Sequence, residues 1–249
     1  LLSEHPATMI AVTTFSKSGY EEYAKKMMES VVKNWPTNLI VYSEFPLESP
    51  GTNIEIRDFF QIPNATSFLT YIKNVPMAFG KVDGGYDYNF DLWRFSRKLF
   101  AQYDVLQEHK GKVFWLDADL YINKPITEGY LDSLFSGHPL VYLGREGLYT
   151  ETGFIGFDTE HEKFHHFLEA YIGCLRQGIV FNLPRWQDCE VFDWARKESG
   201  IKDRNLSPFF KIPKDRKMRR SDLDVIHRSI LGEYILHYKG NRKKKLLKR

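Results

Sequence analysis

The N-terminal part of the chain places a helical segment between two apolar β-type runs. Met9–Thr14 is short, apolar and rich in β-branched residues, and it is followed by the loop Phe15–Gly19. Tyr20–Asn34 then has helical periodicity, and Leu39–Ser43 is apolar again. Two strands joined through a helix pair in parallel by a right-handed crossover. The sequence therefore predicts an α/β protein with a mainly parallel sheet.

Further periodic segments continue this pattern. Val113–Leu116 is fully apolar, as in strands buried on both faces of a parallel sheet. With neither repeat nor linker between the segments, we expect a Rossmann-like, mostly parallel sheet flanked by helices in a single domain over residues 1–240, followed by a basic tail over 241–249. The other predicted strands are Asn53–Phe59, Pro139–Gly144, Thr152–Phe157 and Glu233–Tyr238. The other predicted helices are Pro63–Val75, Phe90–Val105, Ile126–Phe135, Thr159–Gln177, Asp188–Lys197 and Ser221–Leu231, with a turn at Asp83–Gly85.

Composition and termini indicate the cellular environment. The 249 residues include only two cysteines, Cys174 and Cys189, whose spacing matches neither a disulfide framework nor a zinc cluster. No apolar run approaches the roughly 20 residues that span a bilayer. The N-terminus lacks the basic and apolar regions of a signal peptide. We therefore expect a soluble, cytoplasmic protein without a membrane span.

Basic residues are unevenly distributed. The net charge is only +3, yet Lys211–Arg220 and Asn241–Arg249 are strongly basic. Each run is either a solvated surface or a face for an anionic partner. A nucleic-acid-binding module that uses both runs is therefore an alternative function.

Two aspartates follow the apolar strand Val113–Leu116. Asp117 and Asp119 would lie at its carboxyl end, where open α/β sheets bind ligands. Two carboxylates beside a buried strand need compensation, and Mg²⁺ or Mn²⁺ accepts such oxygen ligands while leaving positions for substrate phosphates. A second Asp-x-Asp, Asp222–Asp224, lies in a polar segment where Ser221 and Asp222 fit a helix N-cap. We therefore favour a metal site at Asp117 and Asp119.

A rival metal motif occurs at His161, Glu162 and His165, which match the H-E-x-x-H signature of zinc peptidases. Thr159 and Glu162, however, have the spacing of a capping box, which gives Glu162 a structural role at a helix start. Solvated histidines on an exposed helix are the interpretation we favour. A zinc peptidase remains a second alternative function.

The C-terminal segment holds further candidate ligands. His237 could complete a metal shell and Lys243 could meet a diphosphate, whereas the simpler interpretation is a core histidine and a solvated tail. The sequence has no P-loop, no G-x-G-x-x-G after the first strand and no G-x-S-x-G. If phosphate is bound, a metal and basic side chains must bind it.

These motifs, in this order, resemble the glycosyltransferases of the GT-A fold, and family 8 most closely. The matching motifs are Asp117-x-Asp119, the strand beginning Thr152-Gly153, the pair Gln187-Asp188, and His237-x-x-Gly240-x-x-Lys243. The resemblance extends from Met9 to about Lys243. It implies sugar transfer from a nucleotide-diphosphate sugar, most often a UDP-sugar, with Mn²⁺ (or Mg²⁺) and a retaining mechanism.

The resemblance also implies roles for single residues. It implies metal ligands Asp117, Asp119 and His237, and donor-binding residues Thr13, Thr14, Phe15, Arg94, Lys98, Asp117, Gly240 and Lys243. Asp188, Glu151 and Gln187 would flank the reacting sugar and serve as catalytic residues. The implied partners are a nucleotide-sugar donor and an acceptor that is a glycan, a lipid, a protein or modified DNA.

The chain departs from the family pattern at three places. Glu151-Thr152-Gly153 replaces Asn-Ser-Gly, Trp186-Gln187-Asp188 replaces Asp-Gln-Asp, and Lys244-Lys245 replaces Pro-Trp. An inverting enzyme would need a carboxylate base, which Glu151, Asp188 or Glu190 could supply. The stereochemical outcome is therefore left open by the sequence.

Overall fold

A mostly parallel sheet forms the centre of the molecule. The computed structural model describes residues 8–145, 147–207 and 224–240. Within these residues the sheet has seven strands in the order β10-β8-β9-β6-β1-β2-β3, in which β9 alone runs antiparallel to its neighbours. The strands are β1 Thr8–Phe15, β2 Asn38–Ser43, β3 Ile54–Asp58, β6 Gly111–Leu116, β8 Leu140–Leu143, β9 Glu151–Asp158 and β10 Arg204–Asn205.

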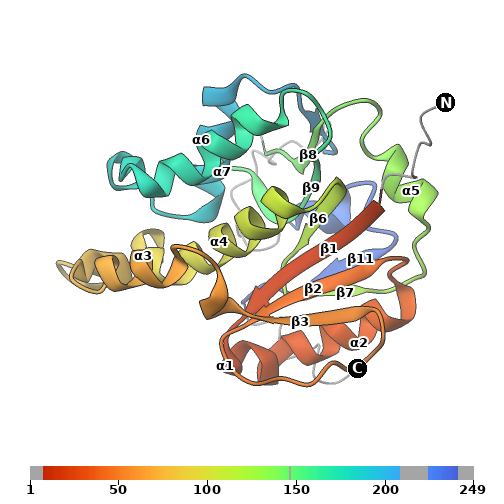
Figure 1. The fold of residues 1–249 in the computed structure, drawn as a ribbon, viewed down its shortest axis with the longest axis horizontal. Coiled ribbons are helices and arrows are strands. Elements are labelled where there is room, and N and C mark those ends of the chain that lie inside the picture. Colours follow the sequence, from red (N-terminus) through yellow and green to blue (C-terminus); the bar gives the residue numbers. More distant parts are fainter. Residues whose placement is uncertain (1–7, 146, 208–223, 241–249) are drawn as a thin grey trace, which may run out of the picture.

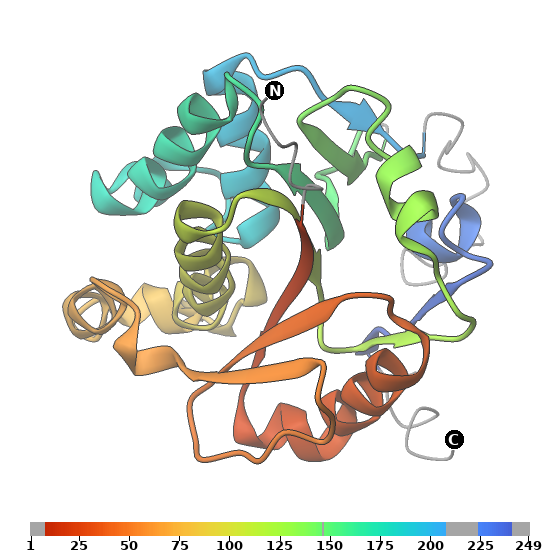
Figure 2. The same ribbon diagram turned by 45° about the vertical axis from the view of Figure 1, so that its right-hand side comes forward.

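Helices cover both faces of this sheet (Figures 1 and 2). The helix α2 (Lys25–Asn34) lies on one face, and α4 (Leu92–Glu108), α6 (Phe164–Arg176) and α7 (Asp188–Ser199) lie on the other. The predicted α/β architecture, a mostly parallel sheet flanked by helices, is therefore confirmed.

Alternation along the strands builds a separate core on each face. In β6, Trp115 packs with the cluster under α4, α6 and α7, whereas its neighbours Phe114 and Leu116 pack with the cluster that includes α2. In β1, Val12 and Ala11 divide in the same way. Each large apolar side chain buried here stabilises the fold by about 1.5–3 kcal/mol.

The first helical segment begins earlier than predicted. Ser16 caps it by accepting a hydrogen bond from the Gly19 amide at 3.2 Å, so α1 (Lys17–Gly19) occupies the expected loop. One π-helical turn over Tyr20–Ala24 joins α1 to α2. The capping serine explains the difference.

Shorter elements complete the structure. The predicted turn at Asp83–Gly85 joins β4 (Lys81–Val82) to β5 (Gly85–Tyr86), and a two-stranded antiparallel pair is formed by β7 (Leu120–Ile122) and β11 (Ile235–His237). The remaining helices are α3 Ala65–Ile72, α5 Glu128–Ser133 and α8 Val225–Arg228, and the 3-10 turns are Phe59–Gln61, Pro76–Phe79, Tyr88–Phe90 and Ile179–Asn182. Within the described ranges, no helix combines the length and apolar character needed to cross a membrane.

Two predicted helix starts are placed differently. The helix α6 begins at Phe164, because the Thr159 hydroxyl is hydrogen bonded to His109 and Gly111 at the start of β6 and does not cap a helix. The helix α8 is capped by Asp224, which accepts from the His227 amide at 3.2 Å. The predicted caps Ser221 and Asp222, and both basic runs, lie outside the described residues.

Candidate functional site

Asp117 and Asp119 lie in the turn between β6 and β7. The Asp117 amide donates to the Gly153 carbonyl of β9 at 2.8 Å, and the Leu120 amide donates back to the Asp117 carbonyl at 3.0 Å. Pairing of β7 with β11 places His237 opposite Leu120, and the Tyr238 amide donates to the Asp119 carbonyl at 3.0 Å. Backbone pairing alone therefore brings His237 to the aspartates.

The three side chains form a compact cluster. Ligand atoms of Asp117, Asp119 and His237 lie within 4.8 Å of one another, and His237 Nε2 is 3.1 Å from Asp119 Oδ1. The His237 side chain is 1% exposed, and its Nδ1 is buried without a hydrogen-bond partner among the described residues. Two carboxylates and an imidazole form a donor set that suits Mn²⁺, so these residues fit a divalent metal.

Because Gly153 has no side chain, the space beside it is open to the side chains of the cluster. A Cβ atom at this position would lie 3.0 Å from His237 Cε1, 3.2 Å from Glu151 Oε1 and 3.4 Å from Asp117 Oδ2. The first two distances are shorter than ordinary van der Waals contact. A side chain here would push against the candidate ligands, which gives the predicted Thr152-Gly153 motif a steric reason.

Lys98 is buried between two carboxylates. Its Nζ lies 2.9 Å from Asp117 Oδ1, 2.7 Å from Asp188 Oδ2 and 2.7 Å from the Thr152 carbonyl. Burial by itself lowers the pKa of Lys98, but the charges of Asp117 and Asp188 raise it above its ordinary value. The lysine is therefore a permanent cation that links α4 to the strand-end aspartate and to α7.

Asp117 and Asp188 also receive neutral donors. Trp115 Nε1 donates to Asp117 Oδ1 at 2.7 Å, and Thr152 Oγ1 donates to Asp188 Oδ2 at 2.6 Å. With Lys98 on the same oxygens, one carboxylate edge of each aspartate is occupied by protein donors. This fixes how both side chains are oriented.

Glu151 lies two residues before Gly153 on β9 and is also paired with cations. Lys239 Nζ bonds to Glu151 Oε2, and Arg145 Nη1 lies 3.7 Å from the same oxygen. Burial tends to raise the pKa of Glu151, but the charges of Lys239, His237 and Arg145 together lower it to about 2. Glu151 is therefore an ionised carboxylate at neutral pH.

The start of α7 contributes Gln187 and Asp188, which are both buried. Gln187 Nε2 donates to Asn89 Oδ1 at 3.3 Å, and the Trp186 amide donates to the Asn89 carbonyl at 2.8 Å. The 3-10 turn Tyr88–Phe90 is thereby joined to the beginning of α7.

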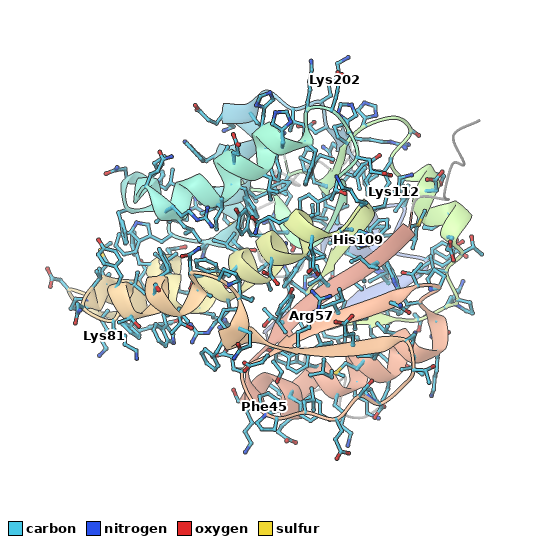
Figure 3. The ribbon with its side chains drawn as sticks, in the orientation of Figure 1. Phe45, Arg57, Lys81, His109, Lys112 and Lys202 are labelled. Carbon is cyan, nitrogen blue, oxygen red and sulfur yellow. The ribbon has the colours of Figure 1, made fainter. Side chains whose placement is uncertain are left out.

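The predicted nucleoside-binding residues lie at the carboxyl end of β1. Thr13 is fully buried, and Thr14 Oγ1 donates to the Tyr42 carbonyl of β2 at 2.8 Å. The Phe15 ring stacks on Tyr20 with 5.8 Å between centroids, and Phe45 lies 6.5 Å away. Figure 3 shows Phe45 close to the start of the first helical segment. The rings of Phe15, Tyr20 and Phe45 therefore form an aromatic cluster at the carboxyl end of β1.

Other predicted donor-binding residues have different surroundings. Arg94 is exposed, one helical turn before Lys98, and its guanidinium lies 5.6 Å from the Tyr88 ring centroid. Gly240 has a φ of 53°, a left-handed conformation that favours glycine. Lys243 lies outside the described residues.

Four residues of this region were not predicted: Arg145, Lys239, Trp115 and Tyr88. Lys239 and Trp115 have a recognisable signal, because Lys239 follows His237 by two residues and Trp115 precedes Asp117 by two, and residues with that spacing on a strand share a face. Arg145 lies in a loop and Tyr88 in a 3-10 turn, where no such spacing applies.

The zinc-peptidase motif does not form a site. His161 and Glu162 lie in the turn before α6, and Glu162 and His165 are exposed. His165 Nδ1 contacts the Glu162 carbonyl at 2.8 Å, while His161 Nδ1 accepts from the Lys163 amide at 3.2 Å. In the part of the chain that the structure describes, these residues have no third ligand, so this alternative is not favoured.

Comparisons with known proteins identify the fold. No protein-family model matches the sequence, and a comparison with curated proteins gives no match. Mouse xyloside xylosyltransferase 1 is similar in structure with a TM-score of 0.51 at 14% identity, over 80% of this chain and 85% of that chain. The bifunctional glycosyltransferase WbbM is similar with a TM-score of 0.54 at 11% identity, over 97% of this chain and 47% of that chain.

A third similar structure is the glycosyltransferase GlyE of Streptococcus pneumoniae, with a TM-score of 0.53 at 12% identity, over 94% of this chain and 55% of that chain. The chain therefore spans about half the length of WbbM and GlyE. At these identities the likeness establishes the fold, which is the fold of these glycosyltransferases and agrees with the predicted GT-A type.

Proposed function

We propose that this protein is a metal-dependent glycosyltransferase that transfers a sugar from a nucleotide-diphosphate sugar, preferably a UDP-sugar, to an acceptor hydroxyl. The observation that carries the proposal is the cluster of Asp117, Asp119 and His237 at the carboxyl edge of a sheet with this fold. Ligands of open α/β sheets bind at that edge. The resemblance to family 8 is part of this proposal.

Asp117, Asp119 and His237 would hold the metal, for which we favour Mn²⁺. When bound, such an ion supplies Lewis-acid stabilisation for the negative charge of a departing diphosphate. Lys98 and Trp115 fix the Asp117 carboxylate, so that its other oxygen stays directed at the cluster. In this proposal the chain's own contribution is a fixed arrangement of donors before any ligand arrives.

The donor nucleoside would lie at the end of β1, near Thr14 and the ring cluster of Phe15 and Tyr20. Arg94, together with Gly240 and Lys243 of the C-terminal motif, would meet the diphosphate. Gln187 and Asp188 would then flank the transferred sugar, since the same lysine joins Asp188 to Asp117.

The state of the carboxylates supports a retaining reaction. An inverting enzyme needs a base that accepts a proton near neutral pH. Glu151 has a pKa of about 2 and is paired with Lys239, so it is a poor base. Asp188 is bound by Lys98 and Thr152, and Glu190 Oε1 lies 3.4 Å from Arg185 Nε. Each of the three candidate bases is therefore already paired with a cation.

The test is a panel of UDP- and GDP-sugars with Mn²⁺, followed by donor hydrolysis and nucleotide binding. We expect turnover with at least one donor, its loss on chelation, and its loss in Asp119→Asn. The matched control is Asp224→Asn in the second Asp-x-Asp, because asparagine also caps a helix. A folded protein that binds no nucleotide with Mn²⁺, or an active Asp119→Asn variant, would overturn the proposal.

A further inference from the structure

A polar cavity lies beside the candidate site. Its volume is about 490 Å³, within the range of small-ligand pockets. The loop between β8 and β9 contributes Arg145 and Thr150, and α7 contributes Arg196 and Lys197. The carboxyl ends of β8 and β10 both line the cavity. These strands run in the same direction as β6, because β9 is antiparallel to both β6 and β8. The cavity therefore opens at the edge of the sheet where Asp117 lies.

A series of contacts that begins at Arg145 links this cavity to the cluster. It lines the cavity, and its Nη1 lies 3.7 Å from Glu151 Oε2. On the other side, Glu151 Oε1 accepts from the Gly153 amide at 3.2 Å, and Gly153 adjoins His237 and Asp117. Arg145 and Glu151 therefore connect the cavity lining to Gly153, which adjoins the candidate metal ligands. A molecule in the cavity would be a neighbour of the transferred sugar.

The described residues of the lining include three cations, Arg145, Arg196 and Lys197, and one acid, Asp193. Two of these cations are offset, because Arg145 Nη1 lies 3.7 Å from Glu151 Oε2 and Arg196 Nη1 lies 2.7 Å from Asp203 Oδ2. Asp193 already accepts from the Thr150 amide at 2.9 Å and from its hydroxyl at 2.6 Å, and it pairs with Arg196 at 3.2 Å. Lys197 is exposed and forms no ion pair with a described residue. A cation is thus left over for a ligand.

Three described residues of the lining have N–H or O–H groups that no described acceptor uses. Arg196 Nε is buried without a partner in the described structure. The Tyr142 hydroxyl accepts from Arg196 Nη1 at 3.1 Å, which leaves its own hydrogen to donate, and burial raises the pKa of Tyr142 so that it keeps this hydrogen. Asn205 uses its Oδ1 to accept from the amides of Gly144 and Ser207, which leaves its amide nitrogen.

We propose that this cavity binds an oxyanion carried by the acceptor, as the carboxylate of an acidic sugar or the phosphate of a sugar phosphate. The charge of Lys197 and the unused donors favour an oxyanion over a neutral sugar. This inference rests on the proposed function, because the bound molecule is an acceptor only if the protein transfers a sugar. Binding itself requires no donor, so the two proposals can be separated.

Calorimetry on the full chain would compare glucuronate, glucose 6-phosphate and glucose. We expect saturable binding of at least one anion, weakened by added salt, and none of glucose at the same concentration. Lys197→Gln should weaken anion binding roughly tenfold, since it removes one charge-assisted hydrogen bond. The matched control, Lys202→Gln, changes an exposed lysine on the surface beyond α7 that does not line the cavity (Figure 3).

Each outcome decides between the alternatives. Binding of glucuronate alone or of the sugar phosphate alone supports the inference and identifies the acceptor's charged group. Equal behaviour of all three sugars, or an unchanged affinity in Lys197→Gln, overturns it even when the protein binds UDP with Mn²⁺. If anions bind as expected but no nucleotide does, the oxyanion site stands and the transferase function is wrong.

Discussion

Lys98 Nζ lies 2.7 Å from Asp188 Oδ2, and the same nitrogen lies 2.9 Å from Asp117 Oδ1. The lysine is on α4, Asp188 is on α7 and Asp117 follows β6. The side chains of Lys98 and Asp188 are 11% and 9% exposed, and that of Asp117 is 30% exposed. Removing one member of a buried ion pair leaves a charge without compensation. The stability of the sheet's carboxyl edge should therefore depend on this lysine.

Lys98→Met should lower the free energy of unfolding by about 3–5 kcal/mol, because Asp117 and Asp188 would lose their shared cation. Urea denaturation followed by circular dichroism measures the change. The control is Lys112→Met, whose partner Asp132 is 56% exposed, and this change should cost about 1 kcal/mol or less. Similar losses in both variants would show that the Lys98 pairs contribute little.

His237→Ala should weaken Mn²⁺ binding by at least about tenfold. Changing a residue that only supports a metal ligand already costs about tenfold or more, and loss of a ligand should cost no less. The reason is that His237 supplies the nitrogen ligand of the proposed set. Titration of Mn²⁺ followed by electron paramagnetic resonance gives the affinity. His165→Ala, in the exposed peptidase-like motif, should bind Mn²⁺ as the wild type does, and an equal loss in both variants would contradict the ligand assignment.

Gly153→Ala should impair the same site while the fold is retained. The added methyl group would stand 3.0 Å from His237 Cε1 and 3.2 Å from Glu151 Oε1, so these side chains must move by a few tenths of an ångström. We expect weaker Mn²⁺ binding with an unchanged circular dichroism spectrum. Gly129→Ala in α5 is the control, because a Cβ there meets nothing within 4 Å. Wild-type affinity in Gly153→Ala would show that the space is not needed.

Glu151 should give stability a marked acid dependence. Its pKa of about 2 in the folded protein lies below the usual 4.5, so the folded state binds fewer protons than the unfolded state between these values. The contribution is fully present above about pH 4.5 and is lost as the pH falls towards about 2.

Urea denaturation across this range should show wild type and Glu151→Gln converging as the pH falls, with wild type more stable at pH 7. Glu162→Gln, on an exposed side chain, should follow the wild-type profile throughout. A constant difference between wild type and Glu151→Gln from pH 7 to pH 3 would show that the carboxylate is not held ionised by its neighbours.

Strong periodicity made most of the fold predictable. The helical segment that became α4 is long enough for its pattern to decide its structure, and the run before Asp117 is fully apolar, as buried strands of parallel sheets are. By contrast, β7 and β10 have three and two residues, too few for any period, and both exist because a partner strand is present. The wrong helix start at Thr159 has a similar cause, since its hydroxyl binds β6 and a local capping pattern cannot reveal that.

The candidate metal ligands were predictable for a different reason. Their order along the chain resembles a family motif, and the structure brings Asp117, Asp119 and His237 together. The partners of these residues were not predictable, because Lys98 meets Asp188 only through the packing of α4 on α7. Likewise, nothing near Arg145 in the sequence indicates that it would face Glu151 and line a cavity.

The contact between His237 and Asp119 spans 118 residues and is made by β11, the last described strand. The strands of the seven-stranded sheet end at Asn205, and β11 pairs with β7 in a separate two-stranded sheet. In the proposed metal site, the turn after β6 would therefore supply two ligands, and this small separate sheet would supply the third.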